Sequence, residues 1–403
     1  MGGVRLALLE GIVLDIGLTR HSLSAKLAVL GAVVCAVSVT LTGYVALREA
    51  GLSLIRQEEQ ALDAIRSSRQ QHVERNIQTI ERQVGSFARS PTVVAALRDF
   101  INAFAALPQE IDPATLEAEI AKTGFARFYD EEVGGRLRER GFARREPIGD
   151  IPVSPGSRWL QWNYVVDSSF EVGKKYMLDR AAGPATYNGV HAEYHPGFRD
   201  FQQSFDYYDI FLIGLGGNVL YTVFKETDFG SNVLPGPYKS TGLAQVYRQA
   251  LTASVESPVC FADFTHYEPS YGSPAGFVAA PVFDGDTLIG VAAFQLPMGT
   301  IESIMTDSHG LRRTGESYLV GPDKLMRSSS RSGRASSILT TKVDTEGVRQ
   351  TLDGKSGTTA QLDYRRERVL ASFAPLQIEG LDWAIVAQID LSEVMAPVSR
   401  LRM

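Results

Sequence analysis

The sequence predicts an α+β protein in which an N-terminal transmembrane helix continues into a long stalk helix. Two tandem modules follow, each with an antiparallel sheet of about five strands. Three observations predict this: an uncharged apolar run near the N-terminus, a regular apolar spacing behind it, and strand-like segments that occur twice in the same order. The length of 403 residues, 44% of them hydrophobic, suffices for two or three domains of about 150 residues each.

The composition argues against several classes of function. Lys and Arg number 40 and Asp and Glu 46, so the chain lacks the basic surplus that binding to a phosphate backbone requires. The two cysteines, Cys35 and Cys260, are far apart and offer neither a disulfide framework nor a cysteine-rich metal site. We therefore expect no nucleic-acid partner, no cofactor and no metal.

The first element is a membrane span over residues 27–47. These residues are uncharged, and at about 1.5 Å per residue they cross a hydrocarbon layer of about 30 Å. A signal peptide would have a shorter apolar core and a cleavage site, whereas this run leads straight into Arg48. Residues 1–26 precede the span. The positive-inside rule gives a tie, because Arg20 and Lys26 lie before the span while Arg48 and Arg56 follow it.

A stalk helix and a short second helix are expected over residues 48–104. Apolar residues are spaced 4, 3, 4 and 3 apart, the rhythm of a helix that packs along one seam; they are Val73, Ile77, Ile80, Val84 and Phe87. Ser90 and Pro91 are typical of the start of a helix, which we expect to end near Phe104. The alternative is a core helix of a soluble domain, but that does not explain direct continuation from a membrane span.

Residues 105–205 have the weakest pattern and are expected to be irregular, with short helical segments. His191 and His195 lie four residues apart with Glu193 between them, a spacing that can hold a metal ion on one helix face. The order H-x-E-x-H does not match the zinc-protease motif. A structural or pocket-lining role is favoured for both histidines.

From Tyr208 onward the pattern becomes that of strands. Two strand-like runs flank Gly216 and Gly217, which is typical of a hairpin. A helical stretch, GLAQVYRQAL, and three more strand-like runs follow, the last two joined by a turn at residues 284–286. Together with its helical insertion, this first module is expected to span residues 105–305.

The same order recurs over residues 310–398. ESYLVGPDKLMRSSS is similar to the first hairpin, and LASFAPLQIEGLDWAIVAQIDL is similar to GFVAAPVFDGDTLIGVAAFQLP. Such an internal duplication predicts a second, smaller module of the same architecture.

The phrases YYDIFLI, YTVFKETDFGSNV, GPYKSTGLAQVYRQAL and TGESYLVGPDKLMRS resemble the extracytoplasmic double Cache sensor regions of bacterial transmembrane receptors, above all methyl-accepting chemotaxis proteins. The resemblance covers residues 25–398 and implies two PAS-like Cache modules. It implies a cytoplasmic N-terminus, an inner-membrane anchor, periplasmic modules and a homodimer through the stalk helix. It also implies a second membrane helix and a cytoplasmic output domain beyond residue 398.

The resemblance further implies a ligand site in the first, membrane-distal module. Amino-acid-binding members grip the carboxylate with an Arg-x-Trp-Tyr segment and the ammonium group with an aspartate on the last strand. The matching segment here is LPGPYKST, which keeps Tyr238 but lacks the arginine and the tryptophan, and Gln295 stands near the place of the aspartate. We therefore expect a small polar or weakly charged metabolite, or a protein partner, rather than a free amino acid.

Seven polar or aromatic residues are predicted to line this site, although strand alternation places only half of any strand on the pocket face. They are Tyr208, Tyr238, Asp263, Tyr267, Ser270, Tyr271 and Gln295.

The expected function is extracytoplasmic sensing of a small molecule for transmembrane signalling, with a conformational shift passed through the stalk. The alternatives are the sensor half of a membrane histidine kinase or nucleotide cyclase, or a membrane-anchored scaffold that binds another envelope protein. A closed apolar module interior would favour the scaffold. No nucleophile elbow, Walker A motif, dinucleotide fingerprint, H-E-x-x-H or kinase signature occurs, so no enzyme activity is expected. The ligand, the output domain, the sign of the response and the natural end of the chain stay open.

Overall fold

The computed structural model describes residues 23–123, 125–142, 154–253, 258–333 and 336–401. The chain divides into two compact units. The larger comprises residues 59–391, and the smaller combines residues 1–58 with residues 392–403. Most of the N-terminal segment 1–26, which the sequence places before the membrane span, lies outside the described residues.

A single helix carries the predicted membrane span and stalk. The helix α1, Leu23–Ala88, runs unbroken for 66 residues. Within the smaller unit its apolar side chains are exposed, as Leu27 and Val39 illustrate. Among the described residues, α1 is the one helix long and apolar enough to cross a membrane. The predicted continuity of span and stalk is confirmed.

The second helix is longer than predicted. The helix α2, Pro91–Glu110, begins with proline in its first turn and continues past Phe104 and through Pro108. The amphipathic pattern of α2 explains the extra turns, because Leu107 is fully buried in the core although it lies beyond the predicted end.

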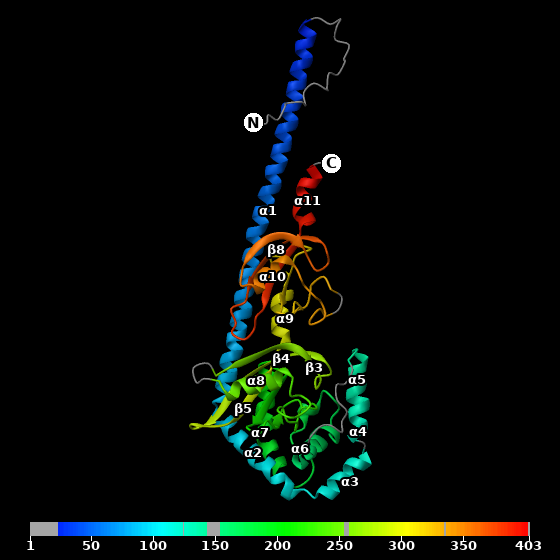
Figure 1. Ribbon diagram of the computed structural model, residues 1–403, viewed down its shortest axis with the longest axis vertical. Helices are drawn as coiled ribbons and strands as arrows, with labels where there is room; N and C mark the ends of the chain where they lie inside the picture. The colour runs from blue at the N-terminus through cyan, green and yellow to red at the C-terminus, as the bar shows by residue number, and fades with distance from the viewer. Residues whose placement is uncertain (1–22, 124, 143–153, 254–257, 334–335, 402–403) are drawn as a thin grey trace, which may run out of the picture. The chain divides into compact units, whose positions relative to one another are not determined.

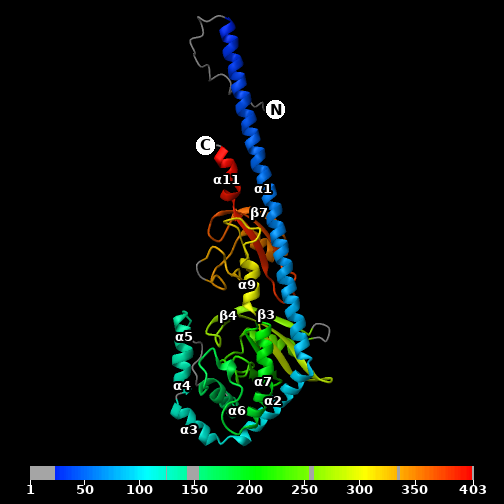
Figure 2. The same ribbon diagram turned by 180° about the vertical axis from the view of Figure 1, so that it is seen from behind.

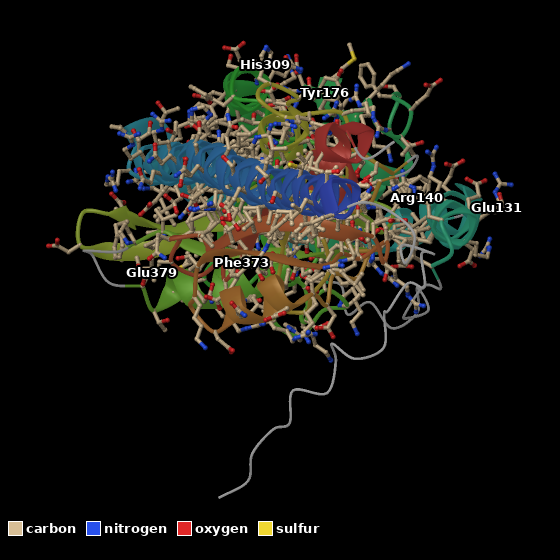
Figure 3. All side chains as sticks on the ribbon, turned by 90° about the horizontal axis from the view of Figure 1, so that it is seen from above. Glu131, Arg140, Tyr176, His309, Phe373 and Glu379 are labelled. Atoms are coloured by element: carbon tan, nitrogen blue, oxygen red, sulfur yellow. The ribbon has the colours of Figure 1, made fainter. Side chains whose placement is uncertain are left out.

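Residues 113–204 contain more regular helix than the sequence indicated. The segments are α3 (Pro113–Thr123), α4 (Phe125–Arg127), η2 (Phe128–Val133), α5 (Gly134–Glu139), α6 (Pro155–Leu160), η4 (Gln161–Val166), η5 (Lys175–Met177) and α7 (Thr186–Ser204). Glu131 lies at the outer side of the α4 to α5 segment (Figure 3). The helix α7 packs beside α2 (Figures 1 and 2).

The first sheet has the five antiparallel strands that the sequence predicts. They are β1 (Asp209–Gly214), β2 (Val219–Thr222), β3 (Cys260–Tyr267), β4 (Ser273–Asp284) and β5 (Thr287–Gln295), in the order β2-β1-β5-β4-β3. The predicted helix is α8, Gly242–Leu251. Alternate residues of β1 face opposite sides: Ile210 and Leu212 join the core with α1, α2 and α7, whereas Phe211 and Ile213 pack with α8.

The second sheet has four strands, whereas the sequence predicted about five. They are β6 (Glu316–Val320), β7 (Gly357–Leu362), β8 (Arg368–Pro375) and β9 (Ala384–Asp390), in the order β6-β9-β8-β7. The segment after β6 pairs through isolated bridges only, Val320 with Met326 and Leu325 with Lys342, and so forms no second hairpin strand. The helices are α9 (Met298–Thr306) before this sheet, α10 (Glu346–Leu352) against it, and α11 (Leu391–Leu401).

The apolar seam of α1 packs against the chain's own core. Val73, Ile77 and Val84 are at most 2% exposed, and the Phe87 ring lies edge-on to the Phe294 ring of β5, 5.0 Å between centroids. The expected homodimer cannot use this seam, because the same chain covers it.

Candidate functional site

Three buried carboxylates lie at one end of the first sheet, on β1 and on the segment that follows β2. They belong to Asp209, Glu226 and Asp228. The Asp209 carboxylate is fully occupied. Its Oδ1 accepts the backbone N–H groups of Ile210, Val223 and Phe224 at 2.7, 2.9 and 2.9 Å, and its Oδ2 accepts the Thr222 hydroxyl at 2.6 Å. Asp209 therefore fixes the chain where β2 ends, which sets the position of the other two acids.

Glu226 brings together three of the residues predicted from the sequence. Tyr208 donates its hydroxyl to Glu226 Oε1 at 2.8 Å, and Ser270 donates to Oε2 at 2.7 Å. Gln295 Nε2 lies 3.5 Å from the Ser270 hydroxyl, whereas Gln295 Oε1 is buried without a partner. These groups form a polar cluster at the edges of β1, β5 and the β3–β4 turn.

Asp228 and its neighbour Thr227 each contact one further predicted residue. Tyr267 donates its hydroxyl to Asp228 Oδ2 at 2.6 Å, while Asp228 Oδ1 is buried without a partner. The Tyr238 hydroxyl lies 2.8 Å from that of Thr227. A buried polar atom that lacks a partner costs about 1–3 kcal/mol, so an unpaired oxygen here is an acceptor that a ligand could use.

Tyr271 lies at the rim of the cluster. It occupies the β3–β4 turn with φ of 55°, and the Arg136 guanidinium lies 5.3 Å from the centre of its ring. The sequence does not predict this contact, because the helical segment that carries Arg136 was expected to be irregular.

Asp263 lies apart from the other six residues. Its carboxylate accepts Arg327 Nε at 2.9 Å and Nη2 at 2.8 Å, and also the Trp383 indole N–H at 2.8 Å. Both partners come from the second sheet's part of the larger unit. Asp263 therefore links the two sheets. Both of its carboxylate oxygens already accept hydrogen bonds from these donors.

A pocket of about 580 Å³ lies beside the polar cluster and is lined by two of its members, Tyr208 and Gln295. Phe224 also lines the pocket and lies beside Tyr208, with 4.7 Å between ring centroids. Asp206, which is exposed, lines the same pocket. Tyr238, Tyr267 and Ser270 are buried and do not line this pocket.

Burial raises the pKa values of two carboxylates in the cluster. It raises the pKa of Asp228 to about 6, although the hydrogen bond from Tyr267 opposes the shift. Burial and the neighbouring Asp228 also raise the pKa of Glu226 well above its usual range. Two lysine amines lie near the cluster. Lys225 Nζ lies 3.0 Å from His195 Nε2, and Lys175 Nζ donates to the Val165 carbonyl at 2.5 Å. Burial lowers the pKa of Lys175, and its electrostatic attraction to Glu226 opposes that shift.

His191 and His195 are buried on α7, with their rings stacked 4.5 Å apart. His195 Nδ1 lies 2.7 Å from the Tyr221 hydroxyl, and His191 Nδ1 lies 2.6 Å from the Asp179 carbonyl. Within the described residues, no group of three or more His, Cys, Asp or Glu side chains could hold a metal ion.

Sequence reasoning missed the three carboxylates themselves. A signal was present, because Asp209 interrupts the apolar run YYDIFLI and the pair Glu226 and Asp228 follows directly on a strand. An acid within or beside an apolar strand needs buried partners.

No family model and no curated protein matches the chain. Among solved structures, the chain is similar to the ligand-binding domain of the Pseudomonas fluorescens chemoreceptor CtaA with L-leucine (13% identity, 48% of this chain and 76% of that chain, TM-score 0.33). It is also similar to that of Pseudomonas aeruginosa PctB with L-Gln (17%, 49% and 75%, TM-score 0.33) and to the periplasmic sensory domain of Campylobacter jejuni Tlp1 (15%, 55% and 85%, TM-score 0.37). These are sensory domains, the class that the sequence resembles.

Proposed function

We propose that the chain is the extracytoplasmic sensor region of a bacterial transmembrane receptor, and that it binds a small molecule in the first module. The observation that carries this is the pocket beside β1 and β5, whose lining includes Gln295 with an unpaired buried oxygen. A module interior without a polar cavity would favour a scaffold, and this pocket has polar residues in its lining, among them Gln202 and Gln295.

The stalk supplies a route for the signal. Phe87 of α1 packs on Phe294, which neighbours Gln295 in β5, so movement at the pocket wall reaches the helix through two contacts. A stiff helix can pass a displacement of about 1–2 Å along its length. We place the N-terminus in the cytoplasm, the α1 span in the inner membrane and the modules in the periplasm. Pairing of two chains would use another face of α1.

The test is ligand screening of the full chain in lipid nanodiscs by thermal shift, followed by calorimetry. A binding metabolite should lose at least tenfold in affinity in Gln295→Ala, because a desolvated hydrogen bond contributes about 1–3 kcal/mol. Gln78→Ala, an exposed position on the stalk, is the matched control and should leave affinity unchanged. A ligand insensitive to Gln295 would contradict the assigned pocket.

A further inference from the structure

Three of the residues predicted to bind a ligand are enclosed by the first module. Tyr238, Tyr267 and Ser270 are at most 3% exposed and do not line the pocket beside Tyr208 and Gln295. A ligand in that pocket therefore cannot contact them while the module keeps this conformation. Contact would require a part of the module to move away.

Residues 125–142, which comprise α4, η2, α5 and the three residues after it, hold the β3–β4 turn from outside. The Arg136 guanidinium lies 5.3 Å from the centre of the Tyr271 ring. Arg140 donates to the Tyr271 carbonyl at 3.3 Å and to the Ser273 hydroxyl. Both arginines are exposed, so they contact the turn from its solvent side.

The same segment directs apolar and aromatic side chains inward. Tyr129, Val133 and Leu137 are at most 2% exposed and form a small cluster separate from the main core of the module. Tyr129 also lies near Tyr238. Burial raises the pKa of Tyr238 well above its usual range, and electrostatic repulsion from Tyr129 adds to that shift. The segment thus covers the enclosed part of the site as well as the turn.

Side chains alone hold the segment to the module. Within the described residues, the backbone hydrogen bonds of residues 125–142 stay inside the segment, as from the Phe142 N–H to the Leu137 carbonyl at 2.8 Å. Phe128 contributes its ring face, 4.6 Å from Lys175 Nζ. In both views α4 and α5 stand at the outer edge of the first module, beyond α6 (Figures 1 and 2). The segment can therefore leave without breaking any strand pairing.

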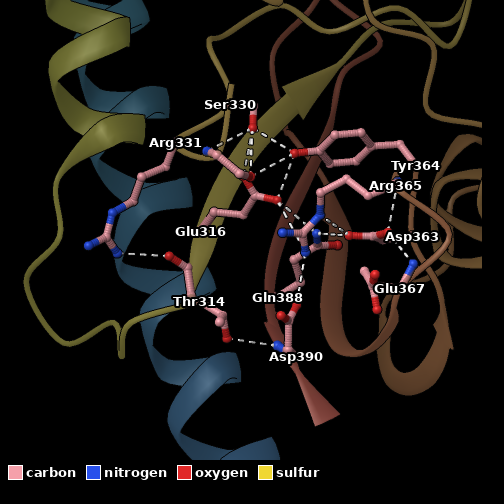
Figure 4. A network of polar contacts seen from close by, with 12 residues as sticks. Thr314, Glu316, Ser330, Arg331, Asp363, Tyr364, Arg365, Glu367, Gln388 and Asp390 are labelled. Atoms are coloured by element: carbon pink, nitrogen blue, oxygen red, sulfur yellow. Dashed lines mark hydrogen bonds and ion pairs between the residues drawn. The ribbon is translucent and has the colours of Figure 1, made fainter. Parts of the chain in front are cut away.

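The second module fixes the corresponding turn by a different means (Figure 4). The turn between β7 and β8 spans residues 363–367 and carries its own arginine, Arg365, which donates to Asp390 of β9 at 2.9 Å. Asp363 of the same turn accepts Gln388 Nε2, also of β9, at 3.0 Å. In the first module the arginines that contact the turn come from a separate segment, so the turn depends on that segment for these contacts.

We infer that residues 125–142 form a lid over the enclosed part of the candidate site, and that this lid opens while the first sheet stays folded. Opening frees the β3–β4 turn and gives access to Tyr238, Tyr267 and Ser270. The purpose of this access rests on the proposed sensor function, whereas the opening itself can be measured without a ligand.

Hydrogen exchange measures the opening in the full chain in nanodiscs. The lid variant combines Arg136→Ala with Arg140→Ala. The control variant combines Arg127→Ala with Arg138→Ala, which removes two charges from the same segment but breaks bonds to partners inside it. Exchange over the turn, residues 268–272, should be at least tenfold faster in the lid variant than in the control variant, because the turn loses its outer contacts. Exchange in β4 and β5 should be equal in the two variants.

A single buried thiol gives a second measurement. Ser270→Cys is introduced into a chain in which Cys35→Ser and Cys260→Ser remove the native thiols. Labelling by N-ethylmaleimide is followed by mass spectrometry, and it should be at least tenfold faster in the lid variant than in the control variant. Should Ser270→Cys fail to fold, hydrogen exchange decides alone.

The outcomes separate the lid from the sensor function. Equal exchange over the turn in the two variants, or equal labelling rates, would overturn the lid. Faster exchange throughout β4 and β5 in the lid variant would also overturn it, because the segment would then be part of the folded core. A metabolite that binds through Gln295 while exchange over the turn is equal would overturn the lid and leave the sensor function standing. A lid that opens in a chain that binds no compound of a broad metabolite panel would support the lid and overturn the sensor function.

Discussion

Arg327 binds Asp263 through two nitrogens, Nε at 2.9 Å and Nη2 at 2.8 Å, across 64 residues of sequence. The arginine side chain is 2% exposed, and Nη1 also pairs with Asp323 at 2.9 Å. Since Asp263 belongs to β3 and Arg327 follows β6, this bidentate pair joins the two modules of the larger unit. Because of this connection, a displacement of Asp263 in the first module would also displace Arg327 in the second.

The first prediction tests this connection. Asp263→Asn removes the charge that faces a buried guanidinium and should lower the free energy of unfolding by about 2–4 kcal/mol, because Asp323 compensates only in part. The measurement is chemical denaturation of the full chain in nanodiscs. Asp284→Asn breaks the exposed pair with Arg98 and should cost at most about 1 kcal/mol. Equal losses in both variants would show that the Asp263 pair has no special role.

The second prediction concerns the α1 seam. Ile77→Asp or Val84→Asp places a charge in a core that is at most 2% exposed, so unfolding free energy should fall by more than about 3 kcal/mol. Gln78→Asp and Arg82→Asp, on the exposed side of the same helix, should change it by less than about 1 kcal/mol. Four similar melting temperatures would mean that the seam does not pack on the modules.

The regular elements of the fold were accessible from sequence because local patterns determine them. Strand alternation and turn residues predict β1 to β5, and the helical stretch GLAQVYRQAL predicts α8. The 4-3 spacing predicts the apolar seam of α1 that packs against the first sheet. The missing strand of the second sheet was not accessible, since ESYLVGPDKLMRSSS has hairpin composition but its second arm pairs through isolated bridges. Pairing across the sheet, and not local propensity, decides such a segment.

The candidate site was only partly accessible for the same reason. Tyr208 and Ser270 donate to Glu226, and Gln295 lies within reach of Ser270. The position of Glu226 after an apolar strand indicates that it needs buried partners, but these partners come from separate segments and the sequence does not identify them. Asp263 was selected as a polar group in an apolar strand, which requires a partner. Its partner is Arg327 of the other module, a long-range contact that no spacing in the sequence reveals.

The third prediction is a pH dependence of stability. The pKa of Asp228 is raised by burial to about 6, above the usual value of 3.8. The folded state therefore holds more protons than the unfolded state between about pH 4 and pH 6, and this contribution to stability is lost as pH rises through that window. A shift of this size corresponds to roughly 3 kcal/mol.

Asp228→Asn removes the titrating group while keeping the shape of the side chain. Its stability relative to the unmodified chain should therefore rise by about 2–3 kcal/mol from pH 4 to pH 7. Denaturation curves of both proteins at pH 4, 5, 6 and 7 measure this difference. Parallel pH profiles would mean that folding does not raise the pKa of Asp228.

The last prediction concerns Arg365, the cation of the second module. Arg365→Ala leaves Glu316, Asp363 and Asp390 without their shared partner, and unfolding free energy should fall by about 3–5 kcal/mol, because Glu316 and Asp363 are buried.

The change also opens a hole of guanidinium shape lined by carboxylates. Ethylguanidinium at millimolar concentration should then raise the melting temperature of Arg365→Ala and leave the unmodified chain unaffected, since a ligand stabilises only the state that binds it. Arg349→Ala disrupts an exposed pair with Asp344 and provides the control, in which ethylguanidinium should have no effect. Rescue of Arg365→Ala would show that this arrangement of acids and glutamine selects a guanidinium by its own geometry. Failure of the rescue in a variant that is destabilised as expected would mean that the cluster depends on the arginine being covalently attached.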